Sequence, residues 1–121
     1  MGRILINSDH RPDGSWVIAP TGKVDVFTYG DLKKCLDELA GANPAVMAVV
    51  DLHGVDYVGS SGWSVLLSRR SSFRRQGGDL SICGMSDKLK RVYDTMKIDD
   101  MLPASASVDD AIKQFRSGQQ A

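Results

Sequence analysis

Two adjacent serines, Ser60 and Ser61, stand where a valine-rich segment gives way to a predicted helix, and Gly59 and Gly62 flank them. The first backbone N–H groups of a helix have no partner within the helix and carry partial positive charge, so they stabilise an anion placed beside them. A phosphate on either hydroxyl would add about −1.5 to −2 charges to the surface there. The pattern therefore fits a phosphorylation site, although from the residues alone a pair of serines that only cap the helix is the simpler interpretation.

A catalytic use of the same serines is the second hypothesis. The residues from Gly59 to Ser61 begin like the nucleophile elbow G-x-S-x-G, but Trp63 stands where the last glycine is required. A serine nucleophile also needs a histidine base, and the chain has two histidines. We expect His10 in a hairpin turn and His53 at the end of a strand. A small serine hydrolase is thus a remote alternative, and we expect a protein that is not an enzyme.

Cofactor motifs are not recognisable in the sequence. Gly22-Lys23 does not form a phosphate-binding loop, because no glycine-rich run precedes it and Val24 replaces the required Ser or Thr. No cluster of His, Cys and carboxylate residues has the spacing of a metal site. We therefore expect no cofactor, no metal and no small-molecule substrate, and any kinase would be a separate protein.

Charge and cysteine content narrow the possible partners. Fifteen basic residues balance fifteen acidic ones, so the net charge is zero, which gives little attraction to nucleic acid or to an anionic membrane. No run of about 18 apolar residues is present, so we expect no insertion into a membrane. Cys35 and Cys83 are expected to be buried free thiols, which indicates a reducing compartment and hence the cytoplasm.

The elements expected to position the serines alternate between strands and helices. Pro12-Asp13-Gly14 predicts a turn between two antiparallel strands, and the valine-rich residues 45–52 predict a central strand buried on both faces. Such alternation indicates a mainly parallel sheet with right-handed crossovers. The expected strands are 3–7, 15–20, 45–52, 79–83 and a short edge strand within 102–106. Two further segments, 21–25 and 54–59, could each form either a strand or a loop. The expected helices are 28–40, ended by 41–44, then 61–76, 86–96 and one opened by Ser107.

The order and spacing of three short motifs resemble one known family. The run VDLxxVxxxxSSG spans residues 50–62, Gly-Lys-Val-Asp spans 22–25, and Gly-Gly-Asp-Leu spans 77–80. Together they are similar to the motifs of STAS domains of the bacterial anti-sigma-factor antagonists, over residues 3–117. The resemblance implies one STAS domain over residues 1–121: an α/β fold with a mostly parallel sheet of four to five strands, an antiparallel N-terminal strand and about four flanking helices.

The resemblance also implies a function by partner switching. In the family, the serine before the glycine is the phosphoacceptor, which is Ser61 here, with Ser60 as second choice. The unmodified protein binds an anti-sigma factor that is also a serine kinase, phosphorylation releases it, and a phosphatase resets the switch. We expect a monomer or weak dimer. The expected partner-binding residues are Asp25, Gly59, Ser60, Gly62 and Trp63.

Two departures from the family pattern concern this same segment. Gly59 replaces an aspartate that many members carry, which removes a carboxylate beside the phosphoacceptor. Trp63 and Ser64 replace the usual leucine and glycine. Trp63 could be either a core residue or an exposed side chain that anchors a partner. An accessory or scaffold subunit with the same fold, serving a stressosome, lipid transport or secretion, is the alternative function.

Overall fold

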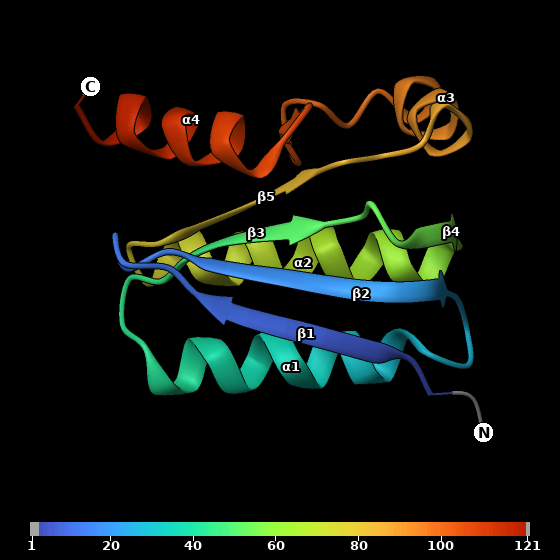
Figure 1. Cartoon of the computed structure of the whole chain (residues 1–121), viewed down its shortest axis with the longest axis horizontal. Coiled ribbons are helices and arrows are strands. Elements are labelled where there is room, and N and C mark those ends of the chain that lie inside the picture. The colour runs from blue at the N-terminus through green and yellow to red at the C-terminus, as the bar shows by residue number, and fades with distance from the viewer. Residues whose placement is uncertain (1–2, 121) are drawn as a thin grey trace.

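A mixed sheet between helical layers makes up the computed structural model of the chain, which describes residues 3–120 (Figure 1). The strands are β1 (Leu5–His10), β2 (Trp16–Val24), β3 (Met47–Asp51), β4 (Val55–Val58), β5 (Asp79–Cys83) and β6 (Ala104–Ser105). The helices are α1 (Tyr29–Ala42), α2 (Ser60–Arg75), α3 (Asp87–Met96) and α4 (Val108–Gln120). None of the helices in this range is long and apolar enough to cross a membrane.

The sheet runs in the order β1-β2-β3-β5-β6, and β4 pairs with the second half of β2. β1 is antiparallel to β2, and all other pairs are parallel. The predicted fold class, with its antiparallel N-terminal strand and parallel remainder, is confirmed. The sheet has six strands because residues 55–58, which the sequence left between strand and loop, form β4.

The central strand β3 is buried on both faces, as predicted for its valine-rich sequence. Ala48 and Val50 pack into the larger core cluster, which also holds the apolar side chains of α1, α2 and α3. Val49 points to the opposite face and packs with Cys83 and with residues of α4. Because neighbouring side chains of a strand alternate between faces, one valine-rich strand serves both cores.

The N-terminal region differs from the prediction in its boundaries. β2 is one continuous strand through Val24, with a register shift between Gly22 and Lys23, so residues 21–24, for which the sequence allowed either a strand or a loop, extend the strand. Gly22 has a φ of +108°, which a glycine adopts at low cost and which keeps the strand continuous through the irregularity. His10 is the last residue of β1 rather than a turn residue, and its ring stacks on Trp16.

Helix boundaries agree with the sequence within a few residues. α1 continues through Gly41 and Ala42, and ends where the backbone N–H and the side-chain amide of Asn43 both donate to the Leu39 carbonyl. Ser107 opens α4 as predicted, since its hydroxyl accepts a hydrogen bond from the Asp110 N–H. Of the two free cysteines, Cys83 is buried as expected, whereas Cys35 is half-buried.

Candidate functional site

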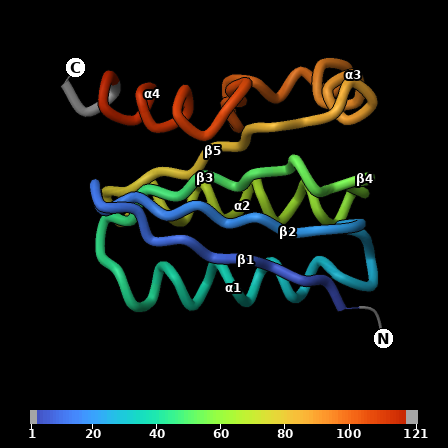
Figure 2. The backbone as a smooth tube through the Cα atoms, viewed as in Figure 1, coloured from blue at the N-terminus to red at the C-terminus, as the bar shows by residue number. Residues whose placement is uncertain are grey.

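The carboxyl ends of β2 and β4 meet at one edge of the sheet. These parallel strands pair so that Val24 lies opposite Val58, and the Gly59 N–H donates to the Val24 carbonyl at 2.8 Å. Asp25 and Gly59, the residues that follow each strand, are therefore brought to the same edge. Figure 2 shows the backbone leaving this edge to enter α1 and α2. The motifs at 22–25 and 50–62 thus form one site, which we call the serine edge.

Ser60 and Ser61 are the first two residues of α2. Gly59 is the N-cap residue, so no side chain caps this helix, and no acidic residue lies in its first turn. Ser60 is exposed and Ser61 is half-buried, and neither hydroxyl forms a side-chain hydrogen bond within residues 3–120. The two hydroxyls therefore lie at a helix N-terminus that carries uncompensated partial positive charge.

Gly62 allows α2 to approach the two strands closely. A Cβ atom built on Gly62 would lie 2.8 Å from Cγ1 of Val24, from the Val24 carbonyl oxygen and from Cγ1 of Val58. Only a residue without a side chain fits at this distance. Because Gly62 is buried, it holds the helix start in place and offers no surface of its own to a partner.

Trp63 lies in the core. Its side chain is 4% exposed, and its ring packs against Tyr93 of α3 with centroids 6.2 Å apart. The ring N–H has no hydrogen-bond partner within the described residues. The structure therefore supports the core interpretation, and the expectation that Trp63 serves as an exposed anchor does not fit its burial.

Asp25 organises the loop between β2 and α1. Its carboxylate accepts hydrogen bonds from the Phe27 N–H at 2.9 Å and the Thr28 hydroxyl at 3.3 Å. Its own N–H donates to the Thr28 hydroxyl oxygen, and that hydroxyl also bonds to the Lys23 carbonyl at 2.7 Å. Asp25 thus lies at the serine edge as expected, and its hydrogen bonds fix the loop rather than either serine.

Exposed apolar side chains surround the serine edge, and the sequence analysis did not single them out. Val26 and Phe27 are 63% and 68% exposed in the loop that Asp25 organises, and Tyr57 of β4 is 46% exposed. The Tyr57 ring lies over Gly59, since a Cβ built there would be 3.2 Å from ring carbon Cε2. The signal available in the sequence was the apolar pair directly after Asp25. Exposed aromatic residues beside the serines are suited to bind a protein partner.

The histidines do not take part in this site. The His10 ring stacks on Trp16, and the His53 N–H donates to the Asp51 carboxylate at 3.0 Å. No hydrogen bond joins either histidine to Ser60 or Ser61 within residues 3–120. In that same range, no group of three His, Cys, Asp or Glu residues is arranged to hold a metal ion. Within the described residues, neither histidine is therefore hydrogen-bonded to either serine as the base of a catalytic triad would be.

Comparison with known proteins identifies relatives of the whole region that contains the site. The model of the STAS domain family matches residues 7–111. The anti-sigma-B factor antagonist of Listeria monocytogenes is 27% identical over 81 residues, which cover 67% of this chain and 70% of that protein. The anti-sigma-B factor antagonist of Bacillus subtilis is 28% identical over 94 residues, 76% of this chain and 83% of the relative.

A solved structure has the same fold over nearly the full length. An anti-sigma factor antagonist from Mycobacterium paratuberculosis superposes with a TM-score of 0.81 at 22% sequence identity. The superposition covers 93% of this chain and 94% of the other. The STAS model's match over residues 7–111 includes both strands and the helix start that form the serine edge.

Proposed function

The chain belongs to the STAS domain family, and from this premise we propose that it is an anti-sigma-factor antagonist that changes partners when Ser61 is phosphorylated. The names of its relatives in Listeria and Bacillus support this role. The single observation that carries the proposal is the start of α2, where two hydroxyls lie at a helix N-terminus that has neither a side-chain cap nor an acidic residue in its first turn.

In its unmodified state, the protein binds an anti-sigma factor through the serine edge. Val26, Phe27 and Tyr57 supply exposed apolar surface, and the Asp25 loop holds the first two of them in a fixed conformation. A neutral serine hydroxyl beside these side chains is compatible with a buried contact. Binding sequesters the anti-sigma factor, and the sigma factor is released.

Phosphorylation reverses this binding. The partner kinase transfers the γ-phosphoryl group of ATP to Oγ of Ser61, which loses its proton, and ADP leaves. The new dianion is stabilised by the first N–H groups of α2 without a change in the fold. It also places about two negative charges in the contact surface, where desolvating them is costly, so the partner dissociates. A phosphatase restores the hydroxyl by hydrolysis.

Gly59 modifies this mechanism at the position where many family members carry aspartate. The Tyr57 ring occupies the space over Gly59. Without that carboxylate, the kinase must recognise the substrate through other groups, and we assign this role to the Tyr57 ring and the Asp25 loop. The absence of a negative charge at the helix start also favours the phosphorylated state electrostatically.

Incubation with candidate anti-sigma kinases and ATP tests the proposal. We expect one phosphate by intact-protein mass spectrometry, mapped to Ser61, and none in Ser61→Ala. Ser64→Ala, an exposed serine in the same helical turn, is the matched control and should accept phosphate as the parent does. A phosphate that maps to Ser60 would show that Ser60, and not Ser61, is the phosphoacceptor. Complete absence of phosphate with every kinase that binds the protein would favour an accessory or scaffold subunit instead.

A further inference from the structure

Helix α4 covers one face of the sheet, and α1 and α2 pack on the opposite face (Figure 1). The buried cluster beneath α4 has five members: Val49, Cys83, Ala111, Ile112 and Phe115. The last three belong to α4 and form the seam that attaches this helix to the strands, which we call the α4 seam. The larger cluster on the other face contains buried side chains of α1, α2 and α3. The two faces of the sheet are therefore covered unequally.

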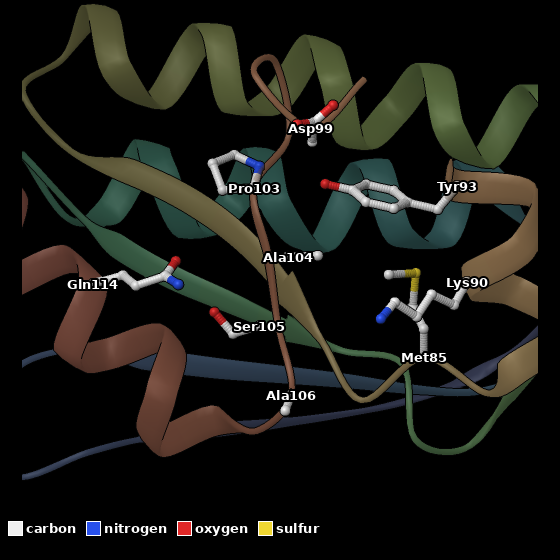
Figure 3. A pocket seen from close by; sticks show the side chains of 9 residues that line it. All are labelled: Met85, Lys90, Tyr93, Asp99, Pro103, Ala104, Ser105, Ala106 and Gln114. Atoms are coloured by element: carbon white, nitrogen blue, oxygen red, sulfur yellow. The ribbon is translucent and has the colours of Figure 1, made fainter. Parts of the chain in front are cut away.

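The sheet surface beneath α4 is partly polar. Ser81 lies beside Val49 in the parallel register of β5 and β3, so it shares the face of Val49 and of Cys83. Ser105 of β6 pairs with Cys83, and in Figure 3 its side chain turns to the side of β6 on which Gln114 of α4 lies. The hydroxyl oxygens of Ser81 and Ser105 are buried without a hydrogen-bond partner within the described residues. We call this surface of Val49, Ser81, Cys83 and Ser105 the α4 floor.

The opposite face of the same strands contrasts with the α4 floor. Its central residues on β3 and β5 are buried and apolar: Ala48, Val50, Leu80 and Ile82. A buried hydroxyl without a partner costs free energy, whereas an apolar side chain in the same place stabilises the contact. Exposure to water would relieve this cost at Ser81 and Ser105. Removal of α4 is therefore less unfavourable than removal of a helix from the other face.

Clefts on both sides of α4 also weaken its attachment. One cleft of about 360 Å³ lies between Phe115 and Gly78 at the start of β5. Another of about 310 Å³ lies between Phe115 and Gly14 in the turn that joins β1 to β2. A third, of about 490 Å³, reaches Gln114 from the side of α3 (Figure 3). Side chains that line such clefts lack neighbouring atoms on one side, so they gain less from dispersion than side chains in a filled core.

Two exposed ion pairs join α4 to the region around the β1–β2 turn. The Arg116 guanidinium lies 3.1 Å from the Asp13 carboxylate, and the Arg11 guanidinium lies 3.7 Å from the Asp109 carboxylate. Ion pairs on the surface contribute little to stability and are screened by salt. The α4 seam is therefore the main attachment of this helix.

We propose that α4 is a displaceable cover, which opens as a unit while the rest of the fold stays intact and which then exposes the α4 floor. Opening breaks the α4 seam and two surface ion pairs, and it brings water to the two hydroxyls of the floor. Such local opening has a lower free energy than global unfolding, because most of the core is retained. The serine edge belongs to β2, β4 and α2, which stay in place, so this inference does not depend on the proposed function.

Alkylation of Cys83 by iodoacetamide under native conditions tests the proposal. In a Cys35→Ser protein, Cys83 is the single thiol. It is 1% exposed, and burial raises its pKa to about 12, so it reacts only when α4 is open. We expect alkylation, followed by intact-protein mass spectrometry, at a rate almost independent of urea below the unfolding transition, because opening one helix exposes little surface.

A thiol on the opposite face provides the matched comparison. Val50→Cys in a Cys35→Ser, Cys83→Ser protein places a thiol in the larger core, where Val50 is fully buried. Relative to the unfolded chain, this thiol should react at least about a hundredfold more slowly than Cys83, with a steep urea dependence, because only global unfolding exposes it.

Core variants separate opening of α4 from global unfolding. Ile112→Ala shortens the α4 seam and should speed alkylation of Cys83 about tenfold or more. Leu39→Ala in α1 is the control, since Leu39 and Ile112 are each 8% exposed, and it should leave that rate unchanged. Ser105→Ala should slow the reaction about threefold or more, because it removes a hydroxyl that favours the open state. Equal acceleration by Ile112→Ala and Leu39→Ala, or a Cys83 thiol that reacts only within the urea transition, would overturn the proposal.

Discussion

The starts of α2 and α3 differ in how they use serine, although both helices follow the carboxyl end of a parallel strand. At α3, Ser86 is the N-cap residue, its hydroxyl accepts a hydrogen bond from the Leu89 N–H at 3.2 Å, and Asp87 adds negative charge to the first turn. At α2, Gly59 is the N-cap residue, and the serines begin one position later. A displacement of one residue therefore separates a capping serine from a serine whose hydroxyl is not used by the fold.

This difference teaches that position relative to the helix start, rather than residue type, marks the candidate phosphoacceptor. Ser107 of α4 follows the pattern of Ser86, with Asp109 and Asp110 in the first turn. The first turns of α1, α3 and α4 each contain an aspartate, and that of α2 contains none. Among these four helices, α2 alone has no negatively charged side chain in its first turn, so an added anion would be stabilised there without competition.

The largest expected effect concerns the affinity for the anti-sigma factor. Ser61→Ala should bind as tightly as the unmodified protein, and Ser61→Asp should bind about a hundredfold more weakly, since an unpaired charge in a contact surface costs on the order of 3 kcal/mol. Titration calorimetry measures both. Ser107→Asp is the matched control, because aspartate also caps a helix, and it should not alter affinity. Equal affinities for Ser61→Ala and Ser61→Asp would remove the functional difference between the two helix starts.

The next effect concerns the stability of the α2 start. Gly62→Ala should lower the free energy of unfolding by about 2 kcal/mol, because the new methyl group meets the Val24 carbonyl and two valine side chains at 2.8 Å. Urea unfolding measures this. Gly30→Ala in the first turn of α1 is the control, since a Cβ there meets nothing within 4 Å. It should be neutral or stabilising. A Gly62→Ala protein as stable as the parent would show that the helix start can shift, contrary to the fixed geometry argued here.

Local patterns in the sequence account for most of the fold. The valine-rich β3, the turn at Pro12-Asp13-Gly14 and the cap at Ser107 depend on neighbouring residues, and each lies where the sequence predicts it. The pairing of β4 with β2 depends on contacts distant in the chain, so the sequence left both segments undecided. Propensity alone does not determine such pairing, which depends on burial and on the strands alongside.

The candidate site was predictable to a similar extent. The family resemblance named Asp25 and Ser61 as site residues, and the structure brings them to one sheet edge because the parallel strands β2 and β4 both end there. The burial of Trp63 depends on Tyr93, a residue of another helix, so the sequence could not decide between core and anchor. The position of the Tyr57 ring over Gly59 was also out of reach, since it depends on a side-chain rotamer and on the loop beside it.

A smaller effect tests the capping difference directly. Ser86→Ala should lower the free energy of unfolding by about 1 kcal/mol, the usual cost of losing an N-cap hydrogen bond. Ser60→Ala should change it by less than about 0.5 kcal/mol, because the Ser60 side chain is exposed and forms no hydrogen bond within the described residues. Paired chemical unfolding curves measure both. A cost at Ser60 equal to that at Ser86 would mean that both helix starts use serine structurally.

The smallest expected effect concerns Ser15. Like Ser86 and Ser107, it has a hydrogen-bonded hydroxyl, which donates to the Asp13 carboxylate at 2.6 Å. This hydrogen bond and that from the Ser15 N–H lower the pKa of Asp13. Because the folded pKa is depressed, the stabilisation is present above the unfolded pKa of about 3.9 and is lost as the pH falls through the folded value.

Ser15→Ala should therefore raise the pKa of Asp13 toward its ordinary value. The free energy of unfolding should then fall less steeply as the pH drops below about 4. Carboxyl ¹³C shifts of Asp13 measure the titration, and Ser60→Ala is the control that leaves it unchanged. An unaltered pKa in Ser15→Ala would show that Arg116, whose guanidinium lies 3.1 Å from the same carboxylate, dominates instead. The Ser15 hydroxyl would then contribute little to the folded state, and the capping hydroxyls of Ser86 and Ser107 would remain the ones that the fold uses.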